Sequence, residues 1–486
     1  MKEKSLGINV VINVIRNVVN IIFPLITFPY ASRALGVNSI GIYNFSYSIV
    51  SYFLLIAALG ISTYAIREGA RYRNNKELLT EFASEIFSIN MLSTIITYIL
   101  MIVVLVNCKS IEKYIVTILI FSIQIFFTTI GVEWLFTICE EFSYITIVNM
   151  IFKVISVFLL FLFVRNQNDY NQYAAITVFA IVGSNIFNMI HMRKRIKYKI
   201  VFRMNIKKHI LPIMIIFASN IAVAIYVNMD VTMLGFMCND YSVGIYSVAV
   251  KVYNVVKNIL AAILIVYIPR LSASIGNSKR NEFKILANKV FNMVTMFLVP
   301  AVIGIIIFAK EIVLLVGGAE YERAKTALRI LGVALLFAIF SWLFSQCILI
   351  PLKLERKVLM ATIISAVVNV VLNLFLIPVW HENAAALTTV VSEFFSVVIC
   401  GYYAIEYFKK ENIVKNIAKV MLSSLFMTLL VCVLKKNVNS IITSIVCGGS
   451  IGALVYFVCL KILKYESIEE LVNKFKYKIK SERKKK

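Results

Sequence analysis

Long apolar segments recur from one end of the chain to the other, and short polar connections separate them. Each segment holds roughly twenty mostly apolar residues, the length of helix that crosses a ~30 Å hydrocarbon core. These runs are continuous rather than alternating, which excludes a transmembrane β-barrel. We expect about fourteen transmembrane helices, near residues 8–31, 39–66, 82–106, 114–138, 142–164, 173–191, 210–236, 244–269, 290–309, 327–350, 358–378, 385–405, 415–434 and 441–463.

Seven ionisable residues lie inside these apolar segments. An ionisable side chain at membrane depth costs at least ~2.5–3.5 kcal/mol, so by default it lines a wet path or a binding site. The seven are Arg16, Glu133, Lys153, Asp230, Lys251, Lys257 and Glu393. They predict a hydrated cavity in a helical bundle and a protein that moves something polar.

The distribution of positive charge predicts the orientation of the chain. The composition is 60% hydrophobic, with a mean hydropathy of +0.86 and a net charge of +25. If the N-terminus is inside, most Lys and Arg residues fall in inner connections, as the positive-inside rule requires. We therefore expect a multi-pass protein of the bacterial cytoplasmic (inner) membrane with both termini cytoplasmic. Its basic tail, 464–486, is expected to lie on anionic membrane lipids, and no nucleic-acid partner is expected.

An internal repeat predicts two lobes. Leu35-Gly36, a turn and Ile40-Gly41-Ile42-Tyr43 recur as Leu234-Gly235, a turn and Val243-Gly244-Ile245-Tyr246. Repeats of six segments keep the same orientation, and a substrate site is then expected between them. We predict an all-α polytopic membrane protein, with two six-helix lobes in parallel pseudo-repeat around a central cavity plus two C-terminal helices. The predicted divisions are 1–200, 201–410, 411–463 and the tail 464–486.

Polar residues at helical spacing form stripes on three of the segments. We predict that they line the cavity, although Asn residues also form ordinary interhelical hydrogen bonds of ~1 kcal/mol or less. The candidates are Asn13, Arg16, Asn17 and Asn20 on the first segment, Lys153 on the fifth, and Asn254, Lys257 and Asn258 on the eighth.

Two acidic residues are candidates for coupling transport to a cation, either H+ or Na+. Glu393 lies near mid-membrane, although pairing with Lys153 or Arg16 would also explain its presence there. Asp230 is predicted at the same depth as Lys251, so a structural ion pair is an equal alternative.

Enzyme chemistry is not predicted. Gly448-Gly449-Ser450-Ile451-Gly452 matches a nucleophile motif, but it lies in an apolar segment and fits a helix-packing pattern better. The three His residues are scattered, and the eight Cys residues form no CxxC pair. We predict no catalytic residue, no metal site and no cofactor, with free thiols among the helices.

Three motifs, in this order along the chain, resemble bacterial polysaccharide transporters, the O-antigen and capsule flippases. They are Gly131-Val132-Glu133-Trp134-Leu135-Phe136 followed by Glu140-Glu141-Phe142, Asp230-Val231-Thr232-Met233-Leu234-Gly235 with Val243-Gly244-Ile245-Tyr246, and Gly317-Gly318-Ala319-Glu320-Tyr321. The resemblance implies the fold of the multidrug/oligosaccharidyl-lipid/polysaccharide exporter (MOP) superfamily. It also implies flipping of undecaprenyl-pyrophosphate-linked oligosaccharide repeat units to the outer leaflet by alternating access, driven by an ion gradient. A polysaccharide polymerase and chain-length machinery are the further partners that it implies.

The predicted cavity suits this substrate. The pyrophosphate needs cations, for which Arg16 is a bidentate partner and Lys153 and Lys257 are point charges. Three alternatives stay open at this point. Two share the fold, a lipid-linked peptidoglycan-precursor flippase and a cation-coupled drug exporter. The third is an enzyme, a membrane polysaccharide polymerase or glycosyltransferase.

Overall fold

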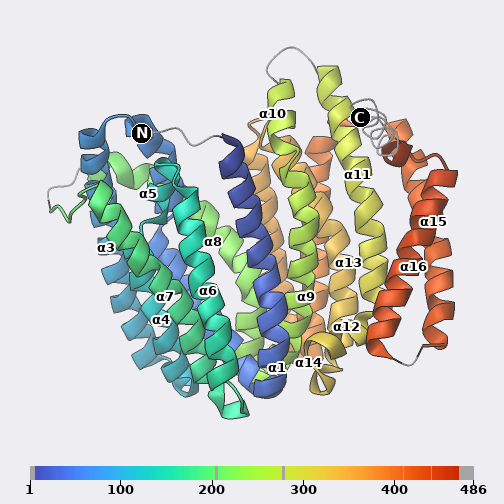
Figure 1. Ribbon diagram of the computed structural model, residues 1–486, viewed down its shortest axis with the longest axis horizontal. Coiled ribbons are helices and arrows are strands. Elements are labelled where there is room, and N and C mark those ends of the chain that lie inside the picture. The colour runs from blue at the N-terminus through green and yellow to red at the C-terminus, as the bar shows by residue number, and fades with distance from the viewer. Residues whose placement is uncertain (1–5, 203–205, 276–279, 409, 439, 470–486) are drawn as a thin grey trace, which may run out of the picture. The chain divides into compact units, whose positions relative to one another are not determined.

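The computed structural model describes residues 6–202, 206–275, 280–408, 410–438 and 440–469, and these are almost entirely helical (Figure 1). Side chains at the N-terminus are described from Phe23 onward. The α-helices are α1 (Leu6–Ala58), α2 (Ile61–Gly69), α3 (Lys76–Asn107), α4 (Ile115–Ile130), α5 (Glu133–Ile138), α6 (Phe142–Phe163), α7 (Tyr170–Arg195), α8 (Ile206–Met237), α9 (Asp240–Ile265), α10 (Ile268–Ile275), α11 (Arg280–Ile307), α12 (Ala309–Val316), α13 (Ala324–Trp342), α14 (Glu355–Ala404), α15 (Lys410–Lys436) and α16 (Ile441–Ile462).

Two of the helices are too long to be single membrane crossings. α1 has 53 residues and α14 has 50, which at 1.5 Å per residue would give rods of about 75–80 Å. Each is interrupted by one residue with non-helical backbone angles, Gly36 (φ 70°) in α1 and His381 (φ 51°) in α14. A positive φ is natural for glycine and strained for histidine. Each long helix is therefore two arms joined at a kink.

Side-chain contacts show that the arms turn back on each other. In α14, Thr388 donates a hydrogen bond to the Asn373 side chain at 2.6 Å, and Asn373 donates one to Asn369 at 3.1 Å. Fifteen residues of straight helix would place Thr388 and Asn373 about 22 Å apart. In α1, Tyr30 and Ser39 reach the carbonyl oxygens of Val164 and Gln167, both in the α6–α7 connection.

The predicted number of crossings agrees with the structure. Among the described residues, twelve helical stretches are long and apolar enough to cross a membrane. Two of these, Phe23–Tyr72 and Glu355–Tyr407, contain the reversals at Gly36 and His381. Each reversal divides one stretch into two crossings, so the twelve stretches correspond to fourteen crossings. The protein is therefore an all-α multi-pass membrane protein, as its sequence predicts.

The chain forms two compact units, Met1–Ser247 and Val248–Lys486. The boundary lies inside α9, because α8 packs against α1 and α2 of the first unit. Gly60, for example, lies against Ile216 of α8. Compactness defines these units, whereas internal repetition defines the predicted lobes 1–200 and 201–410, so the lobe boundaries stay predictions.

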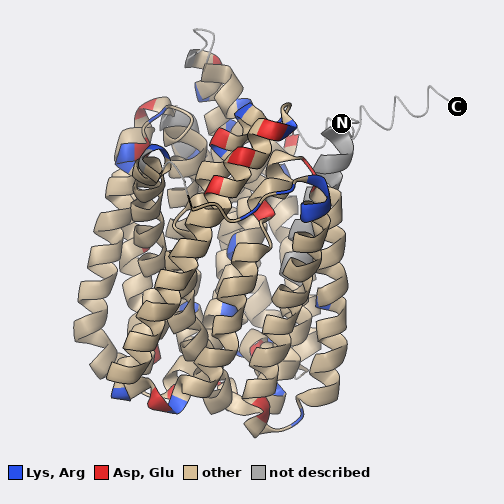
Figure 2. Ribbon diagram, turned by 90° about the vertical axis from the view of Figure 1, so that its left-hand side faces the viewer, with Lys and Arg blue, Asp and Glu red and all other residues tan. Residues whose placement is uncertain are grey.

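The end of the first unit that is predicted to face the cytoplasm is held together by charged side chains. Arg73, after α2, pairs with Glu140, and Arg195, at the end of α7, pairs with Glu141. The hydrogen bond from Arg73 lowers the pKa of Glu140. His209 of α8 is fully buried between the Tyr64 hydroxyl, at 2.7 Å, and Glu85, at 2.9 Å. Charged residues gather at the two ends of the helices in Figure 2, as a membrane protein requires.

Close helix packing at Gly183 gives a test of the fold. A β-carbon on Gly183 of α7 would overlap the ring of Phe152 on α6, whereas one on Gly304 of α11 would meet nothing within 4 Å. We expect Gly183→Ala to destabilise the protein by ~1–3 kcal/mol through overpacking. Gly304→Ala, the matched control, should be neutral or stabilising by up to ~1 kcal/mol. Thermal unfolding in detergent measures both variants, and equal melting temperatures would contradict the packing of α6 on α7.

Candidate functional site

A buried ion pair with a hydroxyl between its members lies in the second unit. Lys257 of α9 approaches Glu393, on the second arm of α14, with 3.0 Å between Nζ and Oε1. Tyr253 donates a hydrogen bond to the same oxygen at 3.4 Å, and its own oxygen accepts one from Lys257 at 3.3 Å. Tyr253 and Lys257 are one helical turn apart, so α9 presents both on one face. The three side chains form a closed triangle.

The members of this triangle differ in exposure. The Glu393 side chain is 5% exposed and the Lys257 side chain is 27% exposed. The ammonium group also lies 5.3 Å from the centre of the Tyr253 ring, within the range of a cation–π contact. Two opposite charges at membrane depth neutralise each other, and Tyr253 supplies a further polar contact. Lys257 is thus the more exposed member of the pair.

Two predicted substrate-binding residues lie next to the triangle on α9. Asn254 and Asn258 are both exposed and one turn apart, and they flank Lys257 along the helix. An Asn side chain offers two donors and one carbonyl oxygen, which match the hydroxyl groups of a sugar. The structure therefore keeps Asn254, Lys257 and Asn258 within two turns of one helix.

Other predicted site residues are placed elsewhere. Lys153 of α6 is half-buried, with its ammonium group 5.7 Å from the centre of the Phe23 ring. The Asp230 carboxylate accepts a hydrogen bond from Tyr246 at 2.7 Å. Asp230 belongs to the first unit and Lys251 to the second, so their pairing stays a prediction. The side chains of four predicted residues lie outside the described part of the chain, and these are Asn13, Arg16, Asn17 and Asn20.

Sequence reasoning found the charged members of the triangle but did not pair them. It left Lys257 without a partner and considered Lys153 or Arg16 for Glu393. The structure pairs Lys257 with Glu393, at a sequence separation of 136 residues. Sequence reasoning also missed Tyr253. The only signal for this residue in the sequence is its position one turn before Lys257.

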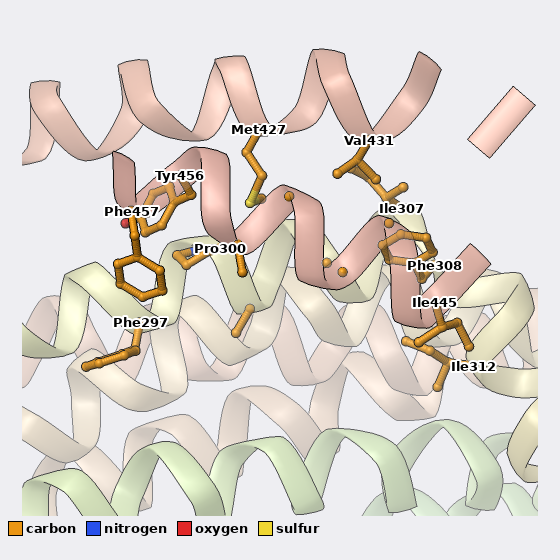
Figure 3. Close-up of a pocket in the computed structure, with 16 residues that line it drawn as sticks. Phe297, Pro300, Ile307, Phe308, Ile312, Met427, Val431, Ile445, Tyr456 and Phe457 are labelled. Carbon is orange, nitrogen blue, oxygen red and sulfur yellow. The ribbon is translucent and has the colours of Figure 1, made fainter. Parts of the chain in front are cut away.

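A separate apolar groove of about 350 Å³ lies in the second unit between α11, α15 and α16 (Figure 3). Phe297, Phe308, Met427 and Tyr456 are among its lining residues. Gly452, which belongs to the predicted helix-packing pattern, lines this groove. A β-carbon on Gly452 would lie 2.6 Å from Val431, which confirms close helix packing at this glycine. A groove with an almost wholly apolar wall suits hydrocarbon and cannot replace the hydration of a polar headgroup.

All eight cysteines are free thiols, as expected. Among the described residues, no group of three or more His, Cys, Asp or Glu side chains is placed to hold a metal ion.

A family model described as "Polysaccharide biosynthesis protein" matches residues 6–275, more than half of the chain. The chain belongs to the polysaccharide biosynthesis protein family. A second model, described as MatE, matches residues 215–375. Both matches agree with the resemblance to MOP-superfamily polysaccharide transporters in the sequence.

Similar proteins of known sequence carry related names. A "Putative O-antigen transporter" of Escherichia coli K12 is 23% identical over 77% of this chain and 90% of its own length. One of Shigella dysenteriae is 25% identical over 72% of this chain and 87% of its own. A "Probable low-salt glycan biosynthesis flippase Agl15" of Haloferax volcanii is 28% identical over 52% of this chain and 53% of its own.

Similar solved structures establish the fold. "Lipid II flippase MurJ, inward closed conformation" has a TM-score of 0.77 and 16% identity, with 94% of this chain and 98% of that chain covered. An inward-facing multidrug resistance MATE family transporter of the MOP superfamily has a TM-score of 0.61 and 12% identity, covering 79% of this chain and 93% of that one.

Removing one partner of the Lys257–Glu393 pair is expected to destabilise the protein. Lys257→Met leaves the buried Glu393 carboxylate without its counter-charge, which costs ~3–5 kcal/mol for a fully buried pair. The partial exposure of Lys257 places the expected loss near the lower end of that range. The double variant Lys257→Met, Glu393→Gln removes both charges and should recover most of the loss. Thermal unfolding of the wild type, both single variants and the double variant forms a cycle, and strictly additive losses would show that the residues do not interact.

Proposed function

We propose that this protein is a flippase that moves undecaprenyl-pyrophosphate-linked oligosaccharide repeat units from the cytoplasmic to the outer leaflet for surface polysaccharide synthesis. The observation that carries the proposal is the similarity of most of the chain to proteins named O-antigen transporters, within the polysaccharide biosynthesis protein family. The relatives bear the names of transporters and of a flippase, which supports transport rather than catalysis.

The physical demands of this substrate match the polar residues inside the membrane. Each sugar hydroxyl costs several kcal/mol if it enters hydrocarbon without a hydrogen-bond partner. Asn254 and Asn258 are exposed partners for such hydroxyls. On the first helix we propose Asn13, Asn17 and Asn20 for the same role. Arg16, Lys153 and Lys257 are the proposed cations for the pyrophosphate.

Lys257 would exchange partners during transport. In the structure, its ammonium group donates a hydrogen bond to Glu393. A pyrophosphate that approaches from the exposed side of Lys257 competes for the same ammonium group, and Glu393 then loses its counter-charge. A buried carboxylate without a counter-charge takes up a proton or another cation. This order of events supports Glu393 as the coupling residue and either H+ or Na+ as the coupling cation. Asp230 is a second candidate for the coupling residue.

The MurJ-like fold favours one second candidate function, a flippase for a lipid-linked peptidoglycan precursor. Both substrates present a polar headgroup on a lipid carrier, so the same cation sites would serve either. A drug exporter has less support, because the matched MATE structure covers 79% of this chain where MurJ covers 94%. We propose the inner membrane as the location, with both termini cytoplasmic and with the polymerase and chain-length machinery as partners.

Deletion of the gene tests the function. We expect undecaprenyl-linked oligosaccharide to accumulate on the cytoplasmic face while surface polysaccharide falls. Wild type should rescue export, whereas Lys257→Ala and Arg16→Ala should reduce it roughly tenfold or more, since a hydrogen bond between charged groups contributes ~1.5–3 kcal/mol. Lys461→Ala, an exposed lysine of α16, is the matched control and should rescue fully. Lipid extraction from sealed inside-out and right-side-out vesicles measures the distribution.

Three results would contradict parts of the proposal. Unpolymerised repeat units on the outer face would indicate a polymerase instead. Rescue of a strain depleted of its peptidoglycan-precursor flippase, with surface polysaccharide unchanged, would favour the second candidate. Full export by Lys257→Ala would remove this residue from the substrate site.

A further inference from the structure

Side chains that can exchange protons recur along one face of the second arm of α14. Ser396, Cys400 and Tyr403 follow Glu393 at spacings of three, seven and ten residues, which place all four on one side of an α-helix. A hydroxyl group, a thiol and a phenol can each both donate and accept a hydrogen bond. Most of the residues between them are Phe, Val and Ile. The four residues therefore form a protic stripe in an otherwise apolar helix.

The middle of the stripe is hydrogen-bonded to a neighbouring helix. The Ser396 hydroxyl lies 2.5 Å from the Ser341 hydroxyl of α13, and either oxygen can be the donor. The Cys400 thiol also forms a hydrogen bond with Ser396. Ser341 and Cys400 are buried, and Ser396 is half-buried. Ser396 is therefore the junction of a small protic network between α13 and α14.

A hydrogen bond between two helices would by itself explain the serine pair. Two observations go beyond packing. Glu393, at the head of the stripe, is buried and paired with Lys257, and its carboxylate lies close enough to Cys400 to act on the thiol electrostatically. The π-helical stretch Leu343–Leu349 begins two residues after Ser341. Such stretches are rare and occur frequently at functional sites.

The other end of the stripe lies at the end of the helix. Tyr403 is half-buried, and the centre of its ring lies 4.7 Å from the ammonium group of Lys357, near the start of the first arm. This end of α14 is opposite to the reversal at His381. The positive-inside pattern predicts that it faces the cytoplasm. The stripe therefore runs from a buried carboxylate at membrane depth to the predicted cytoplasmic end.

We propose that Ser396, Cys400 and Tyr403 form a proton relay through which Glu393 releases its proton to the cytoplasm, with Ser341 as the residue that positions the Ser396 hydroxyl. The relay rests on the proposed function, in which Glu393 takes up a cation when pyrophosphate draws Lys257 away. It also assigns H+ as that cation. Neutral hydroxyl and thiol groups pass a proton along by exchanging hydrogen bonds, whereas a Na+ ion on the same stripe would be a buried charge with too few ligands.

The relay conserves protons and charge. When Lys257 returns to Glu393, its positive charge favours the ionised carboxylate. Glu393 then gives its proton to the Ser396 oxygen while Ser396 gives its own hydroxyl proton to the Cys400 sulfur. Cys400 passes its thiol proton toward Tyr403, and the phenol proton of Tyr403 leaves to water. Each O–H or S–H bond that breaks within the relay is replaced by a new one, so only Glu393 and the final water change charge.

Infrared spectroscopy of the Glu393 carboxyl group tests the relay without any substrate. Full-length protein in liposomes is captured through a C-terminal tag, so that the bath contacts the side on which Tyr403 lies, because α15 and α16 add two crossings. The bath is changed from acidic to neutral pH. The measured quantity is the decay of the carboxylic acid band that Glu393→Gln abolishes.

We expect Ser396→Ala to slow this decay roughly tenfold or more, which is the scale of a positioned proton-transfer group. Ser423→Ala is the matched control, because it removes a buried hydroxyl of α15 that is bonded within its own helix. This control should keep the wild-type rate. Cys400→Ser retains a protic group and should stay within roughly twofold of the wild type, whereas Cys400→Ala should slow the decay.

A double variant separates the relay from packing. Ser396→Ala alone leaves Ser341 without its partner, which costs stability, whereas Ser341→Ala combined with Ser396→Ala removes both partners and is nearly neutral. The melting temperature of the double variant should therefore return toward that of the wild type while proton release stays slow. Release that recovers together with stability would show a structural pair and overturn the proposal.

Two further results would overturn the relay. One is decay at the wild-type rate in Ser396→Ala. The other is the absence of any band that depends on Glu393 at acidic pH, which would also remove Glu393 from coupling. If release depends on Ser396 but deletion of the gene leaves lipid-linked oligosaccharide unchanged, the relay stands and the proposed substrate fails. If lipid-linked oligosaccharide accumulates and Ser396→Ala still releases protons at the wild-type rate, the flippase stands and the relay fails.

Discussion

The structure depends on one constraint, that every polar group placed in hydrocarbon must find a partner within the protein. Lys257 and Glu393 neutralise each other, and Tyr253 fills the space between them. Thr388, Asn373 and Asn369 form a chain of hydrogen bonds across the two arms of α14. Because hydrocarbon offers no hydrogen-bond partners, such contacts help decide which helices are neighbours. They hold together a bundle that apolar contacts alone would leave free to slide.

The same constraint links stability to transport. In the proposed function, a charge that is paired in the structure binds substrate by exchanging its partner, and Lys257 is the more exposed member of its pair. The exchange leaves a carboxylate that needs a new counter-charge, which gives a physical reason for coupling to a cation. In this proposal, the stable pair and the binding site are two states of the same residues. Measurements of stability and of export on the same variants separate these two roles.

Close backbone contacts between helices constrain this protein in a different way from its ion pairs. Gly41 lies against the backbone carbonyl of Asp240, and Gly244 lies against that of Val37. A β-carbon at either glycine would overlap the facing carbonyl, so these contacts admit no larger residue. The turn of each copy of the repeated motif thus contacts a glycine of the other copy.

The sequence by itself determined the fourteen crossings, the repeat, the resemblance to polysaccharide transporters and the residues that carry charge into the membrane. Hydropathy and charge act locally, since each segment must match the bilayer on its own. Only the tertiary structure decided that Lys257 meets Glu393, that α8 packs with the first unit and that Gly41 meets Asp240. These contacts join residues more than a hundred positions apart, and no local pattern records which helix faces meet. Hydropathy alone shows which charged residues lie in membrane segments, because the bilayer acts on each segment separately. The partner of each charge depends on how the helices pack.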